Sequence, residues 1–412
     1  MKILSVIIAH PHRKVSGATN AGRELSIATA RLTPLRLAIM WDADEETIID
    51  GLHVRHMRCF SRVDPFDRLL PRFLQVPLYD SRIPQLIRQD RYDLVHIHNL
   101  IPTFAAERVA RECRRSGIPY VISSHGFNEL TRYAEINGFG RLKTALAEVA
   151  ISRPFRRIVR HAEAIFALSE CETPLLKELG VPEERIHFVT NGVNEYYLRP
   201  PDEAEIRYAR EKFNIGMEPL LFYMGSLHRY KGADVFLRSL SQVKSPFRAV
   251  IAGSFKNSEE PAQLLRQSGI SDKIAAMVSF TGRVSDAELR ALYHLADIFV
   301  YPTQGDTLPL VILEAMASGA PVISTAVGGI PCMLTDECGI VVPPGDSEAV
   351  SSSINSLLEA PERRHAMGKA AKERVEAVFR WSRAAECAVA AYDNVLNSSR
   401  APQFAGKAQG DE

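Results

Sequence analysis

The sequence predicts an α/β protein of two domains, each built around a parallel sheet that is buried on both faces. Three observations support this prediction: a length of 412 residues, short apolar runs that recur along the chain, and a proline-rich break near its middle. A chain of this length exceeds what one hydrophobic core normally supports. The composition, with 46% hydrophobic and 24% charged residues, is ordinary for a protein that fills its cores.

Short runs rich in Val and Ile alternate with longer amphipathic segments, as strands alternate with helices around a parallel sheet. In the first half of the chain we expect strands at residues 3–8, 37–41, 94–98, 120–123, 164–168 and 187–189. In the second half we expect them at residues 220–224, 249–252, 278–281, 298–301, 322–324 and 340–342. The chain therefore contains two βα arrays.

Adjacent prolines combine with charged residues at positions 198–203, which is typical of an exposed linker. We therefore expect an N-terminal domain at residues 1–199 and a C-terminal domain at residues 200–375. The last helical pattern, at residues 361–396, is long enough to bridge the two domains. Its final part, residues 376–396, is expected to form a helix that crosses back to the N-terminal domain.

Residues 397–412 are polar and rich in Gly and Ala, and we expect them to form a disordered tail. The apolar run at residues 3–9 is too short for the core of a signal peptide, and no stretch approaches the roughly 18 apolar residues that span a bilayer. These features favour a cytoplasmic protein, either free or at the inner face of the membrane. The net charge of +1 provides no global field that would attract nucleic acid.

The six cysteines lack the C-x-x-C pairs of a zinc site or a redox dithiol, so we interpret them as reduced core thiols. Ligands of parallel α/β domains bind outside the carboxyl ends of the strands, which places the expected site in the cleft between the domains. The richest segment, residues 301–324, is expected to run from a strand end through a loop, a helix and a turn into the next strand. Pro309 suits the first helical position, so the amides around Thr307 and Leu308 would lie at a helix N-terminus that attracts a phosphate or sugar oxygen.

Two acids of this segment, Asp306 and Glu314, would approach a ligand from different depths, because one precedes the helix and the other lies two turns into it. The segment resembles family 4 of the glycosyltransferases, whose signature is two glutamates separated by seven residues, then Ala-Met-Ala, a Gly and Pro-Val-Ile. The chain matches this signature at residues 314–317 and 319–323. The resemblance implies the GT-B fold, in which two Rossmann-like domains face each other across a cleft.

The resemblance also implies that Glu314 holds the ribose hydroxyls of a nucleotide-sugar donor and that position 306 contacts the transferred sugar. Position 306 is Asp here, one methylene shorter than the usual Glu, which leaves the hexose preference open. The alternative interpretation is that Asp306 only caps the helix and that Glu314 is a solvated helix residue.

A second loop follows the predicted strand at residues 220–224, and a lysine in it, Lys231, would offer a compact positive charge to a diphosphate. The family usually has Gly-Arg-Leu followed by Lys-Gly in this loop, and both basic residues grip the diphosphate. Here Gly225 is followed by Ser226 in place of the arginine. Arg229, on the same loop, is the candidate substitute. The alternative is that both cations are ordinary surface residues.

Further matches extend over most of the chain, and in the family the backbone near Arg283 and Val284 faces the nucleotide base. In the N-terminal half, His125 occupies the position of a histidine commonly found beside the reacting sugar, and we favour this interpretation over a purely structural role. Gly17 retains one glycine of a family pair that allows a close approach to the ligand. Asn191 belongs to a family turn near the cleft, or simply to a tight turn.

Two further segments have competing interpretations. Residues 42–44 spell the Asp-x-Asp pattern with which another glycosyltransferase fold holds a metal, but we favour an ordinary charged loop and expect no metal and no cofactor. Between Arg141 and His161, six bases face one acid, Glu148, amid apolar residues. This segment would either rest on anionic lipid and meet a lipid-linked acceptor, or form a helix with one core face and one solvated basic face. The bases are Arg141, Lys143, Arg153, Arg156, Arg157 and Arg160.

The resemblance implies retaining transfer of a hexose-type sugar from a nucleotide-diphosphate sugar to a glycan, lipid-linked or small-molecule hydroxyl, as in polysaccharide or glycoconjugate biosynthesis. The expected course is front-face substitution, and the expected catalytic residues are Lys231, Asp306 and His125. Two rival interpretations stay open: a catalytically weak nucleotide-sugar-binding or regulatory subunit, and an inverting transferase of the same fold.

Overall fold

The computed structural model describes residues 1–9, 16–64, 66, 70, 75–131 and 138–400, and the chain falls into two units. Unit 1 comprises Met1–Ala167, Thr173–Val189 and the chain from Ala385 onward. Unit 2 comprises Leu168–Glu172 and Thr190–Ala384. The boundary predicted near residue 200 therefore lies inside unit 2, and a short loop of the N-terminal half belongs to unit 2 as well.

Unit 1 contains a nine-stranded sheet with the order β3-β4-β2-β1-β6-β7-β8-β9, and β5 pairs with β4. The predicted strands are all present in it: β1 (Ile3–Ile7), β2 (Leu35–Trp41), β6 (Leu94–His98), β7 (Tyr120–Ser123), β8 (Ala164–Ala167) and β9 (Ile186–Phe188). These strands pair in parallel with their neighbours. Apart from those of the edge strand β9, their side chains are almost all buried, as expected for a sheet covered on both faces.

Three strands at the edge of this sheet were not predicted. They are β3 (Glu45–Ile49), β4 (Leu52–Ser61) and β5 (Tyr79–Ser81). β4 pairs in parallel with β2, whereas β3 and β5 pair antiparallel with β4. Buried and exposed residues alternate in β4, so these strands lack the continuous apolar run that identifies the central strands.

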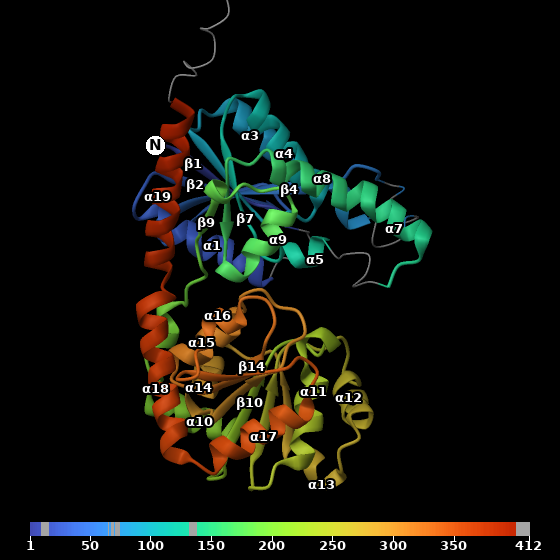
Figure 1. The fold of residues 1–412 in the computed structure, drawn as a ribbon, viewed down its shortest axis with the longest axis vertical. Helices are drawn as coiled ribbons and strands as arrows, with labels where there is room; N and C mark the ends of the chain where they lie inside the picture. The colour runs from blue at the N-terminus through green and yellow to red at the C-terminus, as the bar shows by residue number, and fades with distance from the viewer. Residues whose placement is uncertain (10–15, 65, 67–69, 71–74, 132–137, 401–412) are drawn as a thin grey trace, which may run out of the picture. The chain divides into compact units, whose positions relative to one another are not determined.

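Helices lie on both faces of the unit 1 sheet (Figure 1). The described helices are α1 (Gly17–Ala30), α3 (Ile83–Gln89), α4 (Thr103–Arg115), α5 (Phe127–Thr131), α7 (Arg141–Ala147), the π-helical turn η3 (Glu148–Ser152), α8 (Arg153–Arg160) and α9 (Thr173–Glu178).

Unit 2 contains a parallel six-stranded sheet with the order β12-β11-β10-β13-β14-β15, and its strands coincide with the predicted runs. They are β10 (Leu220–Met224), β11 (Arg248–Ala252), β12 (Val278–Gly282), β13 (Ile298–Tyr301), β14 (Val322–Thr325) and β15 (Gly339–Val342). Helices again lie on both faces (Figure 1). They are α10 (Glu203–Phe213), α11 (Ala233–Ser239), α12 (Glu260–Ser268), α13 (Asp272–Ala275), α14 (Asp286–Leu295), α15 (Leu310–Ala317), α16 (Ile330–Met333), α17 (Ser347–Leu358) and α18 (Pro361–Val378).

Aromatic side chains fill the centre of the unit 2 core. Phe222 of β10 packs edge-on against Tyr293 of α14 at a ring-centroid distance of 5.3 Å, and Phe299 of β13 lies 5.4 Å from the same tyrosine. All three side chains are fully buried. Burial of one such side chain stabilises a fold by about 1.5–3 kcal/mol, so this cluster holds β10 and β13 firmly in place.

The helical pattern predicted at residues 361–396 consists of two helices, and the break between them lies just inside the segment 376–396. α18 ends at Val378, and α19 runs from Trp381 to Arg400. At the break, the backbone N–H of Val193 donates a hydrogen bond to the Phe379 carbonyl at 2.8 Å, and Arg380 forms an isolated parallel bridge with Val193. α19 begins in unit 2 and continues as part of unit 1. Residues 397–400 of the predicted disordered tail are therefore helical, and the rest of the tail lies outside the described residues.

Candidate functional site

The loops that follow β10 and β13 meet at the edge of the unit 2 sheet that is formed by the carboxyl ends of its strands. They meet there because these two central, parallel strands are direct neighbours. The backbone N–H of Gln304 donates to the Tyr230 carbonyl at 2.7 Å. Gly232 has a φ of +79°, and a Cβ at this position would lie 1.9 Å from the carbonyl oxygen of Pro302. The two predicted donor loops are thus interlocked, and Gly232 is required for their close approach.

The buried Tyr223 of β10 supports the first loop from below. Its hydroxyl lies 3.1 Å from the carbonyl oxygen of Lys231 and 3.3 Å from that of Ser226. Gly225 lies directly over this hydroxyl, since a Cβ there would be 3.0 Å from it. The position occupied by Ser226 therefore contributes a backbone carbonyl to the support of the loop.

Lys231 and Asp306 are brought together at this edge. The Lys231 ammonium forms an ion pair with Oδ1 of Asp306. Oδ2 of Asp306 accepts hydrogen bonds from the Tyr301 hydroxyl at 2.9 Å and from Thr303 Oγ1 at 2.7 Å. The side chains of the pair are 20% and 14% exposed, so the pair is partly desolvated. Lys231 also lies 4.9 Å from the centroid of the Tyr230 ring.

The helix that follows this loop begins one residue later than predicted. Pro309 is the N-cap of α15, with ψ at 126°, and the first helical residue is Leu310. No side chain caps this end, so Asp306 is not a helix cap. The extended backbone of the N-cap proline places the start of the helix after it, rather than at it.

The backbone that precedes α15 is held in place by hydrogen bonds to its carbonyl groups. The Thr307 carbonyl accepts from the backbone of Gly329 at 2.6 Å, and the Leu308 carbonyl accepts from Asn191 Nδ2 at 2.9 Å. A Cβ on Gly328 would lie 2.1 Å from the Asp306 carbonyl oxygen, so the glycine pair packs directly beneath the loop. Asn191, expected in the cleft or in a tight turn, therefore supports the donor loop of unit 2.

Glu314 lies on α15 and accepts a hydrogen bond from the Tyr293 hydroxyl at 2.9 Å. Burial raises the pKa of the Glu314 carboxyl to about 7, with the negative charge of Asp286 adding to the rise and the Tyr293 hydrogen bond opposing it. Glu314 is therefore not a solvated helix residue. At neutral pH its carboxyl is present in both protonation states.

The other predicted donor residues lie on neighbouring loops of the same sheet edge. Arg229 is exposed beside Lys231, and its side chain forms no ion pair within the described part of the chain. Arg283 lines an open hollow of about 520 Å³ together with Phe255 and Asn257, which follow the adjacent strand β11. Val284 instead packs against the core of unit 2, so its side chain has a structural role.

In unit 1, three histidines cluster at the ends of β6 and β7. The rings of His96 and His98 lie 3.8 Å apart, and His98 Nδ1 is 3.4 Å from His125 Nε2. His96 hydrogen-bonds Ser123 Oγ at 2.8 Å and the Tyr392 hydroxyl at 2.7 Å. Burial lowers the pKa of His125 to about 4 and those of His96 and His98 well below their usual range, so all three are neutral at pH 7.

The sequence indicated His125 but not the supporting role of the other two histidines. Both lie in the predicted strand at residues 94–98, and the alternation His-Ile-His places them on one face of the sheet. Gly17 lies at the start of helix α1 rather than in a loop, and the closest packing of this helix against the sheet is at another glycine. Gly17 is the first residue of α1 with open space around it, whereas a Cβ on Gly22 would lie 3.0 Å from His98.

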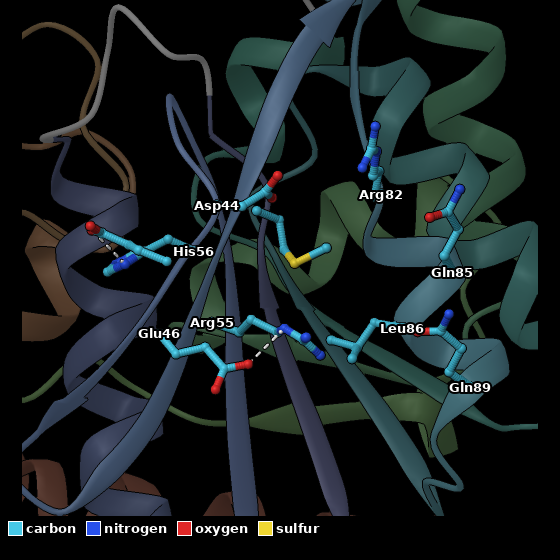
Figure 2. Close-up of a pocket in the computed structure, with 10 residues that line it drawn as sticks. Asp44, Glu46, Arg55, His56, Arg82, Gln85, Leu86 and Gln89 are labelled. Carbon is cyan, nitrogen blue, oxygen red and sulfur yellow. Dashed lines mark ion pairs between the residues drawn. The ribbon is translucent and has the colours of Figure 1, made fainter.

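A second hollow, of about 340 Å³, lies in unit 1 between the β3–β4 hairpin and α3 (Figure 2). Two pairs of its side chains contact each other: Arg55 with Glu46 at 3.1 Å and His56 with Glu45 at 3.0 Å. Asp44, of the Asp-x-Asp pattern, accepts a hydrogen bond from the Arg58 backbone at 2.8 Å. Asp44 therefore has a structural role in the hairpin, and none of the predicted donor residues lines this hollow.

The basic segment forms a nearly continuous helical stretch, α7–η3–α8. It has one face buried in the core and one exposed face that carries the bases. Phe155 and Ile158 are buried in the unit 1 core. Three apolar side chains, Leu142, Leu146 and Val149, are 76%, 41% and 58% exposed. The segment thus combines a core face with an exposed apolar stripe among the bases. No described helix is long and apolar enough to cross a membrane.

Solved structures with a similar arrangement of elements identify the fold. Sucrose-phosphate synthase from Thermosynechococcus elongatus aligns with a TM-score of 0.74 at 20% identity, over 97% of this chain and all of that one. HepE from Anabaena, in complex with UDP-glucose, aligns with a TM-score of 0.70 at 16% identity, over 96% of this chain and 98% of that one. The fold is therefore GT-B, the glycosyltransferase architecture of two Rossmann-like domains.

The chain belongs to glycosyltransferase family 4. The family model described as Glycosyltransferase Family 4 matches residues 42–196, and the model described as Glycosyl transferases group 1 matches residues 205–374. An uncharacterised glycosyltransferase of Methanocaldococcus jannaschii is 24% identical over 403 residues, covering 95% of each chain. A D-inositol 3-phosphate glycosyltransferase of Mycobacteroides abscessus is 27% identical over 362 residues, covering 87% of this chain and 78% of the relative.

Proposed function

We propose that this glycosyltransferase moves a hexose-type sugar, with retention, from a nucleotide-diphosphate sugar to a hydroxyl of a glycan, a lipid-linked or a small-molecule acceptor. The observation that carries the proposal is the interlocked pair of loops, which gathers Lys231, Asp306 and the start of α15 at one sheet edge. The solved HepE complexes with UDP and UDP-glucose support a nucleotide-sugar donor. Polysaccharide or glycoconjugate biosynthesis is the process in which such a transfer would serve.

The donor would lie along this edge with its diphosphate at Lys231. As the bond from the anomeric carbon to the diphosphate breaks, negative charge develops on the departing oxygen, and the Lys231 ammonium and the amides before α15 stabilise it. The acceptor oxygen attacks from the same face, and its proton passes to the departing diphosphate. Arg229 would add a second positive charge where the family usually has the arginine that Ser226 replaces.

Glu314 would hold the ribose of the donor. A carboxyl with a pKa of about 7 both donates and accepts hydrogen bonds at neutral pH, which suits a pair of hydroxyls. Arg283 and its neighbours in the 520 Å³ hollow would face the nucleotide base. In unit 1, neutral His125 would contact the reacting sugar or the acceptor, with His98 fixing its ring. No metal or cofactor is needed for this course.

Removal of the Lys231 ammonium tests this assignment. We expect Lys231→Ala to reduce transfer at least about 100-fold, because a preorganised positive charge at the leaving group is lost. The matched control is Lys369→Ala, since Lys369 is an exposed lysine of the same unit that pairs with Glu373 on α18. Both variants are followed by release of nucleoside diphosphate from a panel of nucleotide sugars. Near-full activity of folded Lys231→Ala would remove this lysine from the mechanism.

We further propose that α7–η3–α8 rests on anionic lipid at the inner face of the membrane and there meets a lipid-linked acceptor. Leu142, Leu146 and Val149 would enter the interface, while Arg141, Lys143 and their neighbours would face the lipid phosphates. The exposed apolar stripe favours this proposal over a merely solvated basic face, because a solvated face has no need of three exposed aliphatic side chains.

A further inference from the structure

The Asp306 carboxylate is fully engaged within the protein. Oδ1 pairs with the Lys231 ammonium, while Oδ2 accepts from Tyr301 and Thr303 at 2.9 and 2.7 Å. Tyr301 is buried at the end of β13, and Thr303 is fully buried two residues later. The lysine expected to bind the diphosphate therefore has a protein anion as its partner, and that anion is anchored from the sheet.

The two ends of this pair differ in mobility. Lys231 carries its ammonium on a flexible four-carbon stem with three donors, whereas Asp306 is short and is held through Oδ2. A partly exposed ion pair favours the paired state over the separated state by a factor of only about two to five. A diphosphate carries more negative charge than one carboxylate and therefore attracts the ammonium more strongly. The diphosphate can therefore take the lysine while the carboxylate stays in place.

We propose that Asp306 is the resting counterion of Lys231 and that the donor diphosphate displaces it, which frees Oδ1 to accept a hydrogen bond from a hydroxyl of the transferred sugar. This inference rests on the proposed function, because it assumes that Lys231 binds the diphosphate. It gives Asp306 two successive partners, first the lysine and then the sugar. It also predicts that Asp306 affects the affinity for a nucleoside diphosphate that carries no sugar. A residue that contacted only the sugar would not affect this affinity.

The experiment is a calorimetric titration of UDP, ADP and GDP into the full chain, as wild type, Asp306→Asn, Lys231→Ala and the double variant. Asp306→Asn should bind the recognised diphosphate about two- to fivefold tighter, because the lysine no longer leaves a charged partner. In the Lys231→Ala background the same substitution should change affinity by less than about 1.5-fold. The asparagine oxygen can still accept from Tyr301 and Thr303, and thermal unfolding checks that the variant is folded.

Asp272→Asn is the matched control, because Asp272 is an exposed aspartate of the same unit on α13, and it should leave the affinity unchanged. Unchanged or weaker binding by Asp306→Asn would overturn the exchange. Tighter binding that persists in the Lys231→Ala background would also overturn it. The effect would then come from the loss of direct repulsion between the Asp306 carboxylate and the diphosphate. A wild-type chain that binds none of the three diphosphates would instead contradict the proposed donor site itself.

Discussion

At the scale of single residues, the proposed donor site depends on protonation and pairing that only the folded chain defines. Lys231 and Asp306 are 75 positions apart, and each was predicted from its own loop. Their direct ion pair was not predictable, because it follows from the parallel pairing of β10 with β13. The same holds for Tyr293 and Glu314, whose contact requires α14 to pack beside α15.

The raised pKa of Glu314 predicts a pH dependence of stability. In the unfolded chain the carboxyl ionises near 4.5, whereas in the folded protein it stays protonated until about pH 7. The folded state therefore binds more protons, and the contribution of Glu314 to stability is lost as pH rises through this window. The free energy of unfolding should fall by about 2 kcal/mol between pH 5 and 7 on account of this group alone.

Urea unfolding of wild type and Glu314→Gln at pH 5, 6 and 7 isolates this effect. The buried histidines have lowered pKa values and act in the opposite direction, but they are common to both proteins and cancel in the difference. The stability of Glu314→Gln relative to wild type should rise with pH. Parallel curves for the two proteins would mean that Glu314 ionises normally.

At the scale of elements, the central strands were predictable because a strand buried on both faces is a continuous apolar run. The edge strands β3, β4 and β5 were missed, since their exposed positions carry residues such as Glu46 and Arg55. The break between α18 and α19 was missed for a different reason. No Gly or Pro marks it, and the backbone hydrogen bond found there comes from Val193, which is distant in the sequence.

The helical stretch α7–η3–α8 gives an element-scale prediction about membranes. Wild type should sediment at low salt with vesicles of phosphatidylglycerol and phosphatidylcholine, and release should follow at about 0.5 M salt because screening weakens the basic contacts. Leu142→Ser combined with Val149→Ser should reduce binding about tenfold, since two exposed apolar side chains would no longer enter the interface.

Met217→Ser is the control for this loss, because Met217 is 97% exposed but lies in unit 2. It should bind vesicles as wild type does. Absence of sedimentation at low salt, or equal losses in the control, would leave α8 as a helix with a core face and a solvated basic face.

At the scale of the whole molecule, two parallel α/β units carry different sets of chemical groups. Unit 2 gathers a lysine, an exposed arginine and two carboxylates at its sheet edge, which suits a charged donor. Unit 1 presents neutral histidines at the ends of its strands, which suits an uncharged sugar or hydroxyl. The family and the fold were predictable because short motifs at strand ends specify them. The sugar and the acceptor were not, because they depend on side chains that converge only in the folded chain.

Retaining transfer from a nucleotide sugar fixes the anomeric configuration of the first-formed product. Proton NMR of a reaction of the full chain with the recognised donor and a hydroxyl acceptor reports this configuration through the coupling constant of the anomeric proton. We expect a product with the same anomeric configuration as the donor sugar. A product of opposite configuration would establish an inverting transferase, and donor binding without turnover by any acceptor would indicate a nucleotide-sugar-binding subunit.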